Sequence, residues 1–467
     1  MKNLVVGNGI NIQFGGSDNT NKSIIIRAIR NCKELDFPKH IIVDDPDLML
    51  TMIGHLFLEV QSLLKDGYEK FAISSVERGG LEEFRNRYKR FPNLKLTDIG
   101  FEDYYLIYDL FCHKNKINSS EKITIKNAIR SFFLHSIYNK GKINEIYTNY
   151  PAKLLKFFNN FDSIFTTNYD RNIEVFTGKQ IFYLHGAFHI KKDEYNSESM
   201  RNKLSDRHTK DYIIDENYYY LYTNALTDYS GDLKTSSITQ NVFANTSIEK
   251  MAKGYIENEA IRKDVDSWKN ESNPILNNMY ESIMLKLKYP NLKFDETYPI
   301  KQFQGISGSV VILGLSPFND THIFKGINEN TKIDNVVYYF YDIKERDLVK
   351  TMLKNYNVTF NNVMDFWRDN IMATNITKKD FHKFAEVFRS CTGSTMKDND
   401  ILNGYNSIDK KRRVLLFVEI NQIIQERNLP FDKALPLITV DLNILAAEED
   451  TDPAILLMLY IDNLKKR

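Results

Sequence analysis

Four polar or glycine-bearing runs contain the residue types that could do chemistry, and each follows an apolar segment of strand length. They are Gly7-Asn8-Gly9-Ile10-Asn11, Thr166-Thr167-Asn168-Tyr169-Asp170, His185-Gly186 and Gly314-Leu315-Ser316-Pro317-Phe318-Asn319-Asp320. Glycines let a backbone approach a pyrophosphate closely and present its amides. An asparagine amide can hold a ribose hydroxyl or position a water, and a histidine can act as a base. Gly186 is expected to leave room for a ligand beside His185.

Each run also has an ordinary structural explanation. The first glycine pair is as readily a strand-to-loop turn, and Ile12 stands where the dinucleotide fingerprint has its third glycine, which disfavours an ordinary dehydrogenase. A single polar residue after a strand, such as Asn168 or Asp170, is commonly a turn residue or a helix cap. A lone histidine such as His185 is commonly a satisfied core residue, and His322 either lines the same site or caps a helix.

The elements that must position these runs are buried strands. Five apolar segments have the right length and composition, at residues 3–6, 163–167, 180–184, 309–313 and 335–341. Segments with helical apolar spacing lie between them, and strands that alternate with helices form parallel sheets. We therefore predict an α/β fold with a Rossmann-like parallel sheet. Ligands of such sheets bind beyond the carboxyl ends of the strands, where the four runs are expected to lie.

The remaining segments divide the chain. Residues 1–345 are predicted to form the nucleotide-binding domain, with a helical insertion at about 46–160 and a polar insertion at about 187–305. From 346 to 467 the strand signal fades and helical periodicity dominates. We predict a mainly α-helical C-terminal domain there, with a regulatory or partner-binding role.

Composition excludes several classes of protein. The 62 lysines and arginines balance 61 aspartates and glutamates, so no global field favours nucleic acid or an acidic membrane. The basic run at 410–413 is best explained as a solvated helix end. Three distant cysteines, Cys32, Cys112 and Cys391, build neither a disulfide framework nor a Cys-x-x-Cys metal site. With no signal-peptide pattern and no run of roughly 18 uncharged apolar residues, we expect a cytoplasmic protein that does not act at a membrane.

The order of the four runs resembles the sirtuin family. Typical members show Gly-Ala-Gly-x-Ser, Thr-Gln-Asn-x-Asp, His-Gly and Gly-Thr-Ser in this order, and the match here extends from residue 4 to about 342 over some two dozen positions. The resemblance implies a site for NAD. It differs from the typical pattern at Asn8, Thr167 and Leu315, which replace alanine, glutamine and threonine.

The resemblance also implies roles for individual residues. Asn168 would hold the nicotinamide ribose or the attacking water, and His185 would be the general base, acting through a ribose hydroxyl or a water. The residues that would bind the rest of NAD are Gly7, Asn8, Gly9, Asn11, Thr167, Asp170, Gly314, Ser316 and Asp342. In that set Gly7 and Gly9 face the pyrophosphate, Asn11 takes the place of the family's serine, and Asp170 organises the nicotinamide side. Gly314 and Ser316 hold the adenosine ribose and phosphate, and Asp342 bonds the adenine ribose.

One departure changes the expected activity. Protein-deacetylating sirtuins carry four zinc-binding cysteines between the His-Gly and Gly-Thr-Ser strands, whereas residues 187–308 contain no cysteine. The sequence therefore argues against a deacetylase and against a metal cofactor. Sirtuin-like proteins without the zinc module look like bacterial anti-phage proteins that hydrolyse NAD to ADP-ribose and nicotinamide, and the AbiH abortive-infection family has a similar Gly-Asn-Gly start.

This resemblance implies an NAD hydrolase that stays inactive until triggered, because uncontrolled loss of NAD would kill the cell. Control by homo-oligomerisation, by a companion defence protein or by a phage-derived trigger fits the sequence equally well. A non-catalytic sensor of NAD or ADP-ribose is the alternative, and ADP-ribose transfer to an acceptor is a third possibility. The presence of both Asn168 and His185 favours the enzyme.

Overall fold

The core of the protein is one six-stranded sheet in which every strand is parallel. The computed structural model describes residues 1–371 apart from 191–214, 291–297 and short gaps (66, 90, 92, 118–119, 227–228, 271–273 and 289), and also residues 395 and 397. The strands are β1 (Lys2–Val6), β2 (Ser163–Thr166), β3 (Ile181–Tyr183), β4 (Gly308–Leu313), β5 (Ile333–Phe340) and β6 (Val358–Asn362). Their order is β3-β2-β1-β4-β5-β6. This confirms the predicted α/β fold with a Rossmann-like parallel sheet.

Long helical segments separate the strands. Between β1 and β2 lie α1 (Gly9–Gly15), α2 (Asn21–Asn31), α3 (Lys39–Ile42), α4 (Pro46–Leu64), α5 (Ser75–Tyr88), α6 (Asp103–Lys114), α7 (Ser120–Tyr138) and α8 (Ala152–Asn159). Helix α9 (Asn172–Thr177) lies between β2 and β3, and between β3 and β4 lie α10 (Gly231–Glu257), α11 (Glu259–Ser267), α12 (Pro274–Lys288) and α13 (Ile300–Gln304). The helices that follow β4, β5 and β6 are α14 (Thr321–Glu329), α15 (Ile343–Met352) and α16 (Val363–Ile371).

Alternate residues of the strands feed two cores, one on each face of the sheet. Leu4 and Val6 pack into the core that includes buried residues of α1, α8, α9 and α16, whereas Val5 packs into the core with α13, α14 and α15. Because strand side chains alternate between faces, a strand covered on both sides must be apolar throughout. This is why the central strands read as continuous apolar runs in the sequence.

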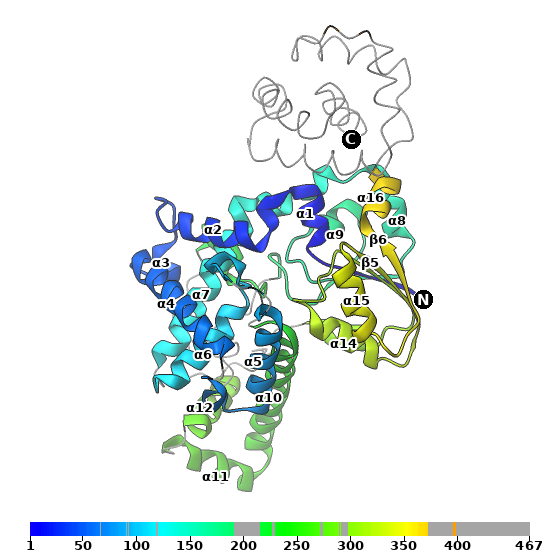
Figure 1. The fold of residues 1–467 in the computed structure, drawn as a ribbon. Coiled ribbons are helices and arrows are strands. Elements are labelled where there is room, and N and C mark those ends of the chain that lie inside the picture. Colours follow the sequence, from blue (N-terminus) through cyan, green and yellow to red (C-terminus); the bar gives the residue numbers. More distant parts are fainter. Residues whose placement is uncertain are drawn as a thin grey trace.

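The other helices gather beside the sheet rather than over it, as Figure 1 shows for α2 to α7 and α10 to α12. Helix α10 contacts both α5 of this group and α14 of the sheet region. Helix α5 begins with a capping box in which Ser74 and Glu77 bond each other's backbone amides. Helix α10 therefore links the helical group to the sheet region.

Among the described residues, α4 is the one helix long and apolar enough to cross a membrane. Its buried positions are Met49, Ile53, Leu56, Val60 and Leu63. Their spacing of three and four residues is that of a helix with one face in a protein core. Here that face packs in the core that also includes α5 and α6.

The sequence analysis missed β6. This strand pairs in parallel with β5, so the sheet continues to residue 362, past the boundary predicted at 345. Its sequence, Val-Thr-Phe-Asn-Asn, is short and half polar because β6 is an edge strand with partly exposed residues. Of the domain predicted at 346–467, the described part is 346–371, which holds most of α15, β6 and α16, with residues 395 and 397, and the remainder lies outside the described residues.

Glycines allow the loops after β1 and β4 to touch. The amide of Gly7 donates to Leu313 O at 3.0 Å, and that of Gly9 donates to Gly314 O at 2.8 Å. A Cβ atom on Gly7 would lie 2.4 Å from Gly314 O, which is a backbone atom and cannot turn aside. The chain reverses its direction of strand addition between β1 and β4, so this contact lies at the point where ligands of such sheets bind.

We predict that Gly7→Ala lowers the free energy of unfolding by about 3 kcal/mol, because the new methyl group overpacks the contact between β1 and β4. Urea unfolding followed by circular dichroism measures this change. Gly79→Ala is the matched control, since no atom lies within 4 Å of its added Cβ inside α5. That variant should gain about 0.5–1 kcal/mol from the helix preference of alanine. Equal effects of the two substitutions would contradict the contact.

Candidate active site at the carboxyl edge of the sheet

The four polar runs lie side by side at the carboxyl ends of neighbouring strands. His185 follows β3, Asn168 follows β2, Gly7 follows β1 and Gly314 follows β4, and these four strands are adjacent in the sheet. Residues separated by more than 300 positions in the chain are therefore brought to one edge. The sequence analysis anticipated this arrangement from the parallel sheet.

Asn168 is buried beside the β1 loop. The residue is 6% exposed, and its Nδ2 atom donates to Gly7 O over a long distance of 3.4 Å. Its backbone amide donates to Thr166 Oγ1 at 3.0 Å, and the neighbouring Thr167 amide donates to Val6 O at 3.1 Å. The loop is thus fixed by its backbone and by Thr166, while the Asn168 amide side chain makes only one weak bond among the described residues.

Asp170 and Asn11 form a buried pair between the β2 and β1 loops. Asn11 Nδ2 donates to one Asp170 oxygen at 2.6 Å, and the Asn172 amide donates to the other at 2.9 Å. Burial raises the pKa of Asp170, and these hydrogen bonds offset part of the rise. Asn11 Oδ1 has no hydrogen-bond partner among the described residues. Asp170 therefore orients Asn11 and leaves one polar atom of it unused.

The two glycine amides expected to face a pyrophosphate are engaged within the protein. As described above, those of Gly7 and Gly9 donate to the backbone after β4. The close approach of the loops after β1 and β4 therefore explains why residues 7 and 9 are glycines. Asn8 is the exposed residue of the run, and its side chain donates to Asn19 O at 2.7 Å.

Gly186 does not leave room for a ligand, which corrects one expectation of the sequence analysis. Its φ of 81° is in the left-handed region, and an added Cβ would lie 1.9 Å from Asn224 O. Asn224 Oδ1 also accepts from the Ala187 amide at 2.9 Å. The space is filled because Arg130, buried on α7, donates to four carbonyls of residues 221–226 and holds that segment against the loop.

His185 is 3% exposed and has a partner at each ring nitrogen. Lys234 Nζ lies 3.4 Å from Nδ1, and Nε2 of His322 lies 3.0 Å from Nε2. Burial lowers the pKa of His185 well below its usual range, and the positive charge of Lys234 lowers it further. The imidazole is therefore neutral at neutral pH. Since an ammonium can only donate, Nδ1 is the acceptor and the ring proton is on Nε2.

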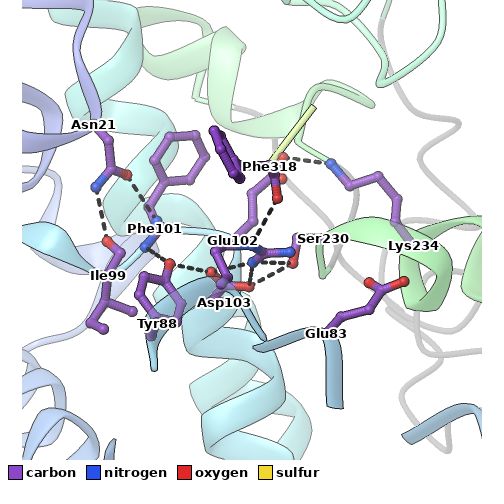
Figure 2. Close-up of polar contacts among 12 residues, drawn as sticks. Asn21, Glu83, Tyr88, Ile99, Phe101, Glu102, Asp103, Ser230, Lys234 and Phe318 are labelled. Carbon is purple, nitrogen blue, oxygen red and sulfur yellow. Dashed lines mark hydrogen bonds and ion pairs between the residues drawn. The ribbon is translucent and has the colours of Figure 1, made fainter. Parts of the chain in front are cut away.

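Lys234 joins this histidine to the helical group. It has no exposed surface, and it forms an ion pair with Glu102 Oε1 at 2.5 Å (Figure 2). Tyr169 in the β2 loop donates to the same oxygen at 2.9 Å. The sequence analysis missed both charged residues. Lys234 is near the start of α10 and Glu102 precedes α6, 132 positions apart, so no local pattern links them.

A second charged pair holds the loop after β4. Arg87 donates to both oxygens of Asp103, at 2.5 and 2.6 Å, and to Phe318 O at 2.9 Å. Tyr88 and Ser230 donate to the same carboxylate, each at 2.5 Å, as Figure 2 shows. Burial, followed by the charge of Asp103, raises the pKa of Tyr88 well above its usual range. Both oxygens of Asp103 accept hydrogen bonds from these donors, so the Arg87–Asp103 pair has a structural role and holds the loop after β4.

Asp320 is different because its carboxylate forms no hydrogen bond with any described residue. It occupies the N-cap position of α14, where an aspartate usually accepts from the first-turn amides, yet no such bond is made. Burial raises the pKa of Asp320 to about 7, and the negative charge of Glu102 contributes, while Lys234 and Arg87 oppose the rise. Asp320 therefore takes up a proton far more readily than an ordinary aspartate.

One group of described residues could hold a metal ion: His185, Asp320 and His322 have ligand atoms within 4.8 Å of one another. The surrounding hydrogen bonds do not fit this use. Metal-bound histidines donate their second N–H to an acceptor, whereas Nδ1 of His185 faces the ammonium of Lys234 and buried Nδ1 of His322 has no partner among the described residues. The hydrogen bonds around these three residues therefore do not favour a bound cation.

The two remaining predicted contacts are partly occupied by local bonds. Ser316 Oγ accepts from the Phe318 amide at 3.4 Å in the β4 loop. Asp342 follows β5 and caps α15, accepting from the Glu345 amide at 2.9 Å. Asp342 therefore has the ordinary capping role that Asp320 lacks.

The fold and this edge define a Rossmann-like α/β protein with a buried cluster of ionisable residues at the carboxyl ends of its strands. No family model matches the chain, and comparison with curated proteins and with solved structures gave no match.

We predict that Asp320→Asn stabilises the protein at pH 8 and changes little at pH 4. An aspartate ionises near pH 3.8 in the unfolded chain but near 7 in the folded one, so the wild type loses stability as the pH rises through this range. The amide avoids that loss, and we expect a gain of about 2–4 kcal/mol at pH 8.

Urea unfolding at the two pH values measures this difference. Asp45→Asn is the matched control, because Asp45 is exposed and its carboxylate caps α4 by accepting from the Asp47 amide at 3.0 Å. An equal gain in unfolding free energy at pH 4 and pH 8 for Asp320→Asn would show that the surroundings do not destabilise the ionised carboxylate.

Proposed function

We propose that the protein hydrolyses NAD to ADP-ribose and nicotinamide at the carboxyl edge of the sheet. One observation carries most of the argument: Asn168 and His185, the two residues assigned to cleavage, follow adjacent strands β2 and β3 next to the switch point. Asn11 Oδ1, Thr321 Oγ1 and His322 Nδ1 are buried there without partners. Polar atoms left unsatisfied in this way are costly to folding and are typical of functional sites.

The chemistry of NAD cleavage suits these side chains. When the glycosidic bond breaks, its electron pair neutralises the pyridinium ring and positive charge builds on the ribose carbon. A carboxamide oxygen such as that of Asn168 stabilises such a charge or orients water toward it, and more strongly in a buried site than in bulk water. Neutral His185 can hydrogen-bond a ribose hydroxyl without repelling the developing cation.

The sirtuin-like resemblance supports NAD as the substrate, with the AbiH-like family as the close relative. In this proposal Asn8, Thr167, Gly314 and Ser316 contact NAD as loop residues near the switch point, and Asp342 contacts the adenine ribose. No metal is assigned a role in the cleavage. A protein deacetylase is disfavoured, since the zinc-binding cysteines that shape the acyl-lysine groove are missing from residues 187–308.

The burial of the site supports a latent enzyme of anti-phage abortive infection. His185 and Asn168 are almost inaccessible to water, and Lys234 of α10, itself fully buried, lies against His185. Substrate therefore reaches the site only when α10 or a neighbouring loop moves. We propose that a phage-derived trigger, homo-oligomerisation or a companion defence protein causes this movement in the cytoplasm.

Release of nicotinamide and ADP-ribose from NAD, separated by chromatography, tests the activity. We expect release by the wild type in the presence of lysate from phage-infected cells, and a fall of about 1,000-fold in Asn168→Ala and His185→Ala. His40→Ala is the control for the histidine substitution, because His40 is exposed on α3 and, among the described residues, its Nε2 bonds Asp215 alone.

The outcomes separate the competing functions. Tight NAD binding without cleavage, with or without lysate, would favour a non-catalytic sensor. Nicotinamide release with ADP-ribose attached to a protein or nucleic acid would indicate transfer to an acceptor in place of water. Equal release by the wild type and both site variants would remove the reaction from this edge of the sheet.

A further inference from the structure

The proposed hydrolysis needs an acceptor for the proton of the attacking water, and His185 is poorly placed to be that acceptor. Its Nδ1 lone pair faces Lys234, and its Nε2 carries the proton toward His322. A neutral imidazole in this tautomer has no free lone pair until one of the two partners leaves. The base must then come from another side chain at the same edge.

Asp320 has the properties of such a base. Its carboxylate lies within 4.8 Å of the ring nitrogens of His185 and His322, so it belongs to the same cluster. Asp103, the neighbouring buried carboxylate, is fully hydrogen-bonded, and Glu102 bonds both Lys234 and Tyr169. Asp320 alone of these three makes no hydrogen bond with a described residue. Its oxygens are therefore available to a water or a substrate hydroxyl.

The two cations near Asp320 are each paired with another carboxylate. Lys234 is paired with Glu102, and Arg87 is paired with Asp103. The two histidines are neutral, because burial and the charge of Lys234 lower the pKa of both well below the usual range. The charges that act on Asp320 are those of Glu102 before α6, Lys234 on α10 and Arg87 on α5. The uncharged titratable groups near it are His185 after β3, His322 on α14, Tyr169 in the β2 loop and Tyr338 on β5. Lys234 and Arg87 are each neutralised by a carboxylate of their own, Glu102 and Asp103, so an ionised Asp320 adds one negative charge that neither cation is left to balance.

Resting on the proposed function, we infer that Asp320 is the general base that takes the proton from the attacking water, while His185 acts as a hydrogen-bond donor. In this step the water oxygen bonds the ribose carbon as the bond to nicotinamide breaks, and the electron pair of that bond stays on the pyridine nitrogen. The water proton passes to the Asp320 carboxylate. Deprotonation to solvent returns the carboxylate, so NAD and water give ADP-ribose, nicotinamide and one proton.

This assignment makes a specific kinetic prediction. Asp320→Asn keeps the shape of the side chain but cannot accept a proton, so kcat should fall by about 100-fold or more while KM changes by less than about threefold. In the wild type, kcat should rise with pH as the carboxyl of Asp320 ionises near its pKa of about 7. The variant should lack this rise.

A second variant distinguishes a base from a structural residue. Asp320→Ala should regain part of its activity when formate, a small carboxylate, is added, whereas loss of packing would not be restored by formate. Asp45→Asn, in the exposed cap of α4, is the matched control and should keep the wild-type pH profile. All assays use the full chain under the condition in which the wild type cleaves NAD, and NAD binding by calorimetry confirms that each variant is folded.

Three results would overturn the inference. Unchanged cleavage by Asp320→Asn would exclude the base while leaving the proposed hydrolysis intact, whereas absence of cleavage by the wild type would refute the hydrolysis itself. A pH profile that keeps its rise near 7 in Asp320→Asn would assign that titration to another group. Micromolar binding of Zn²⁺ or Mn²⁺ that is lost in His322→Ala, with activity removed by a chelator, would replace the base by a metal-bound water.

Discussion

The ion pair between Lys234 and Glu102 is the interaction on which the candidate site depends. A lysine with no exposed surface is tolerated only where its charge is paired and its hydrogen bonds are satisfied. Glu102 supplies the negative charge that pairs with Lys234, and the Nδ1 atom of His185 accepts a hydrogen bond from the same ammonium group. The tautomer of the histidine follows from this buried ammonium, which also adds to the effect of burial in keeping the imidazole neutral. Asp320 is in turn left as the carboxylate that no cation compensates.

Both partners of this pair come from outside the sheet. Glu102 belongs to the helices between β1 and β2, and Lys234 belongs to α10, between β3 and β4. The sheet supplies the histidine, the asparagine and the loop backbone, and the helical segments set their ionisation states. The polar chemistry of this edge is therefore a property of the whole described chain rather than of the six strands alone.

Much of the sheet could be predicted from the sequence, because strands covered on both faces must be continuously apolar and the central strands are. The edge strand β6 escaped detection since Asn361 and Asn362 break that rule where one side is open. The placement of Asn168 and His185 at the carboxyl edge followed from parallel topology, whereas the adjacency of their strands, β2 and β3, is known only from the structure. Lys234, Glu102 and Arg87 were not predictable, because their roles arise from contacts between segments more than 100 positions apart. Gly186 was misread, since only the fold shows that Asn224 fills the space beside it.

The hydrogen bonds from Arg130 to the carbonyls of residues 221–226 have an evolutionary consequence. One guanidinium in the first helical segment fixes the carbonyls of a turn in the second, and that turn presses its backbone onto Gly186 next to His185. Insertions elsewhere in either segment would leave these contacts untouched, whereas a change at Arg130, Asn224 or Gly186 alters the fit of the other two. Among descendants of this chain, residues 130, 186 and 224 should change together or stay the same. The lengths of the surrounding segments should vary without this constraint.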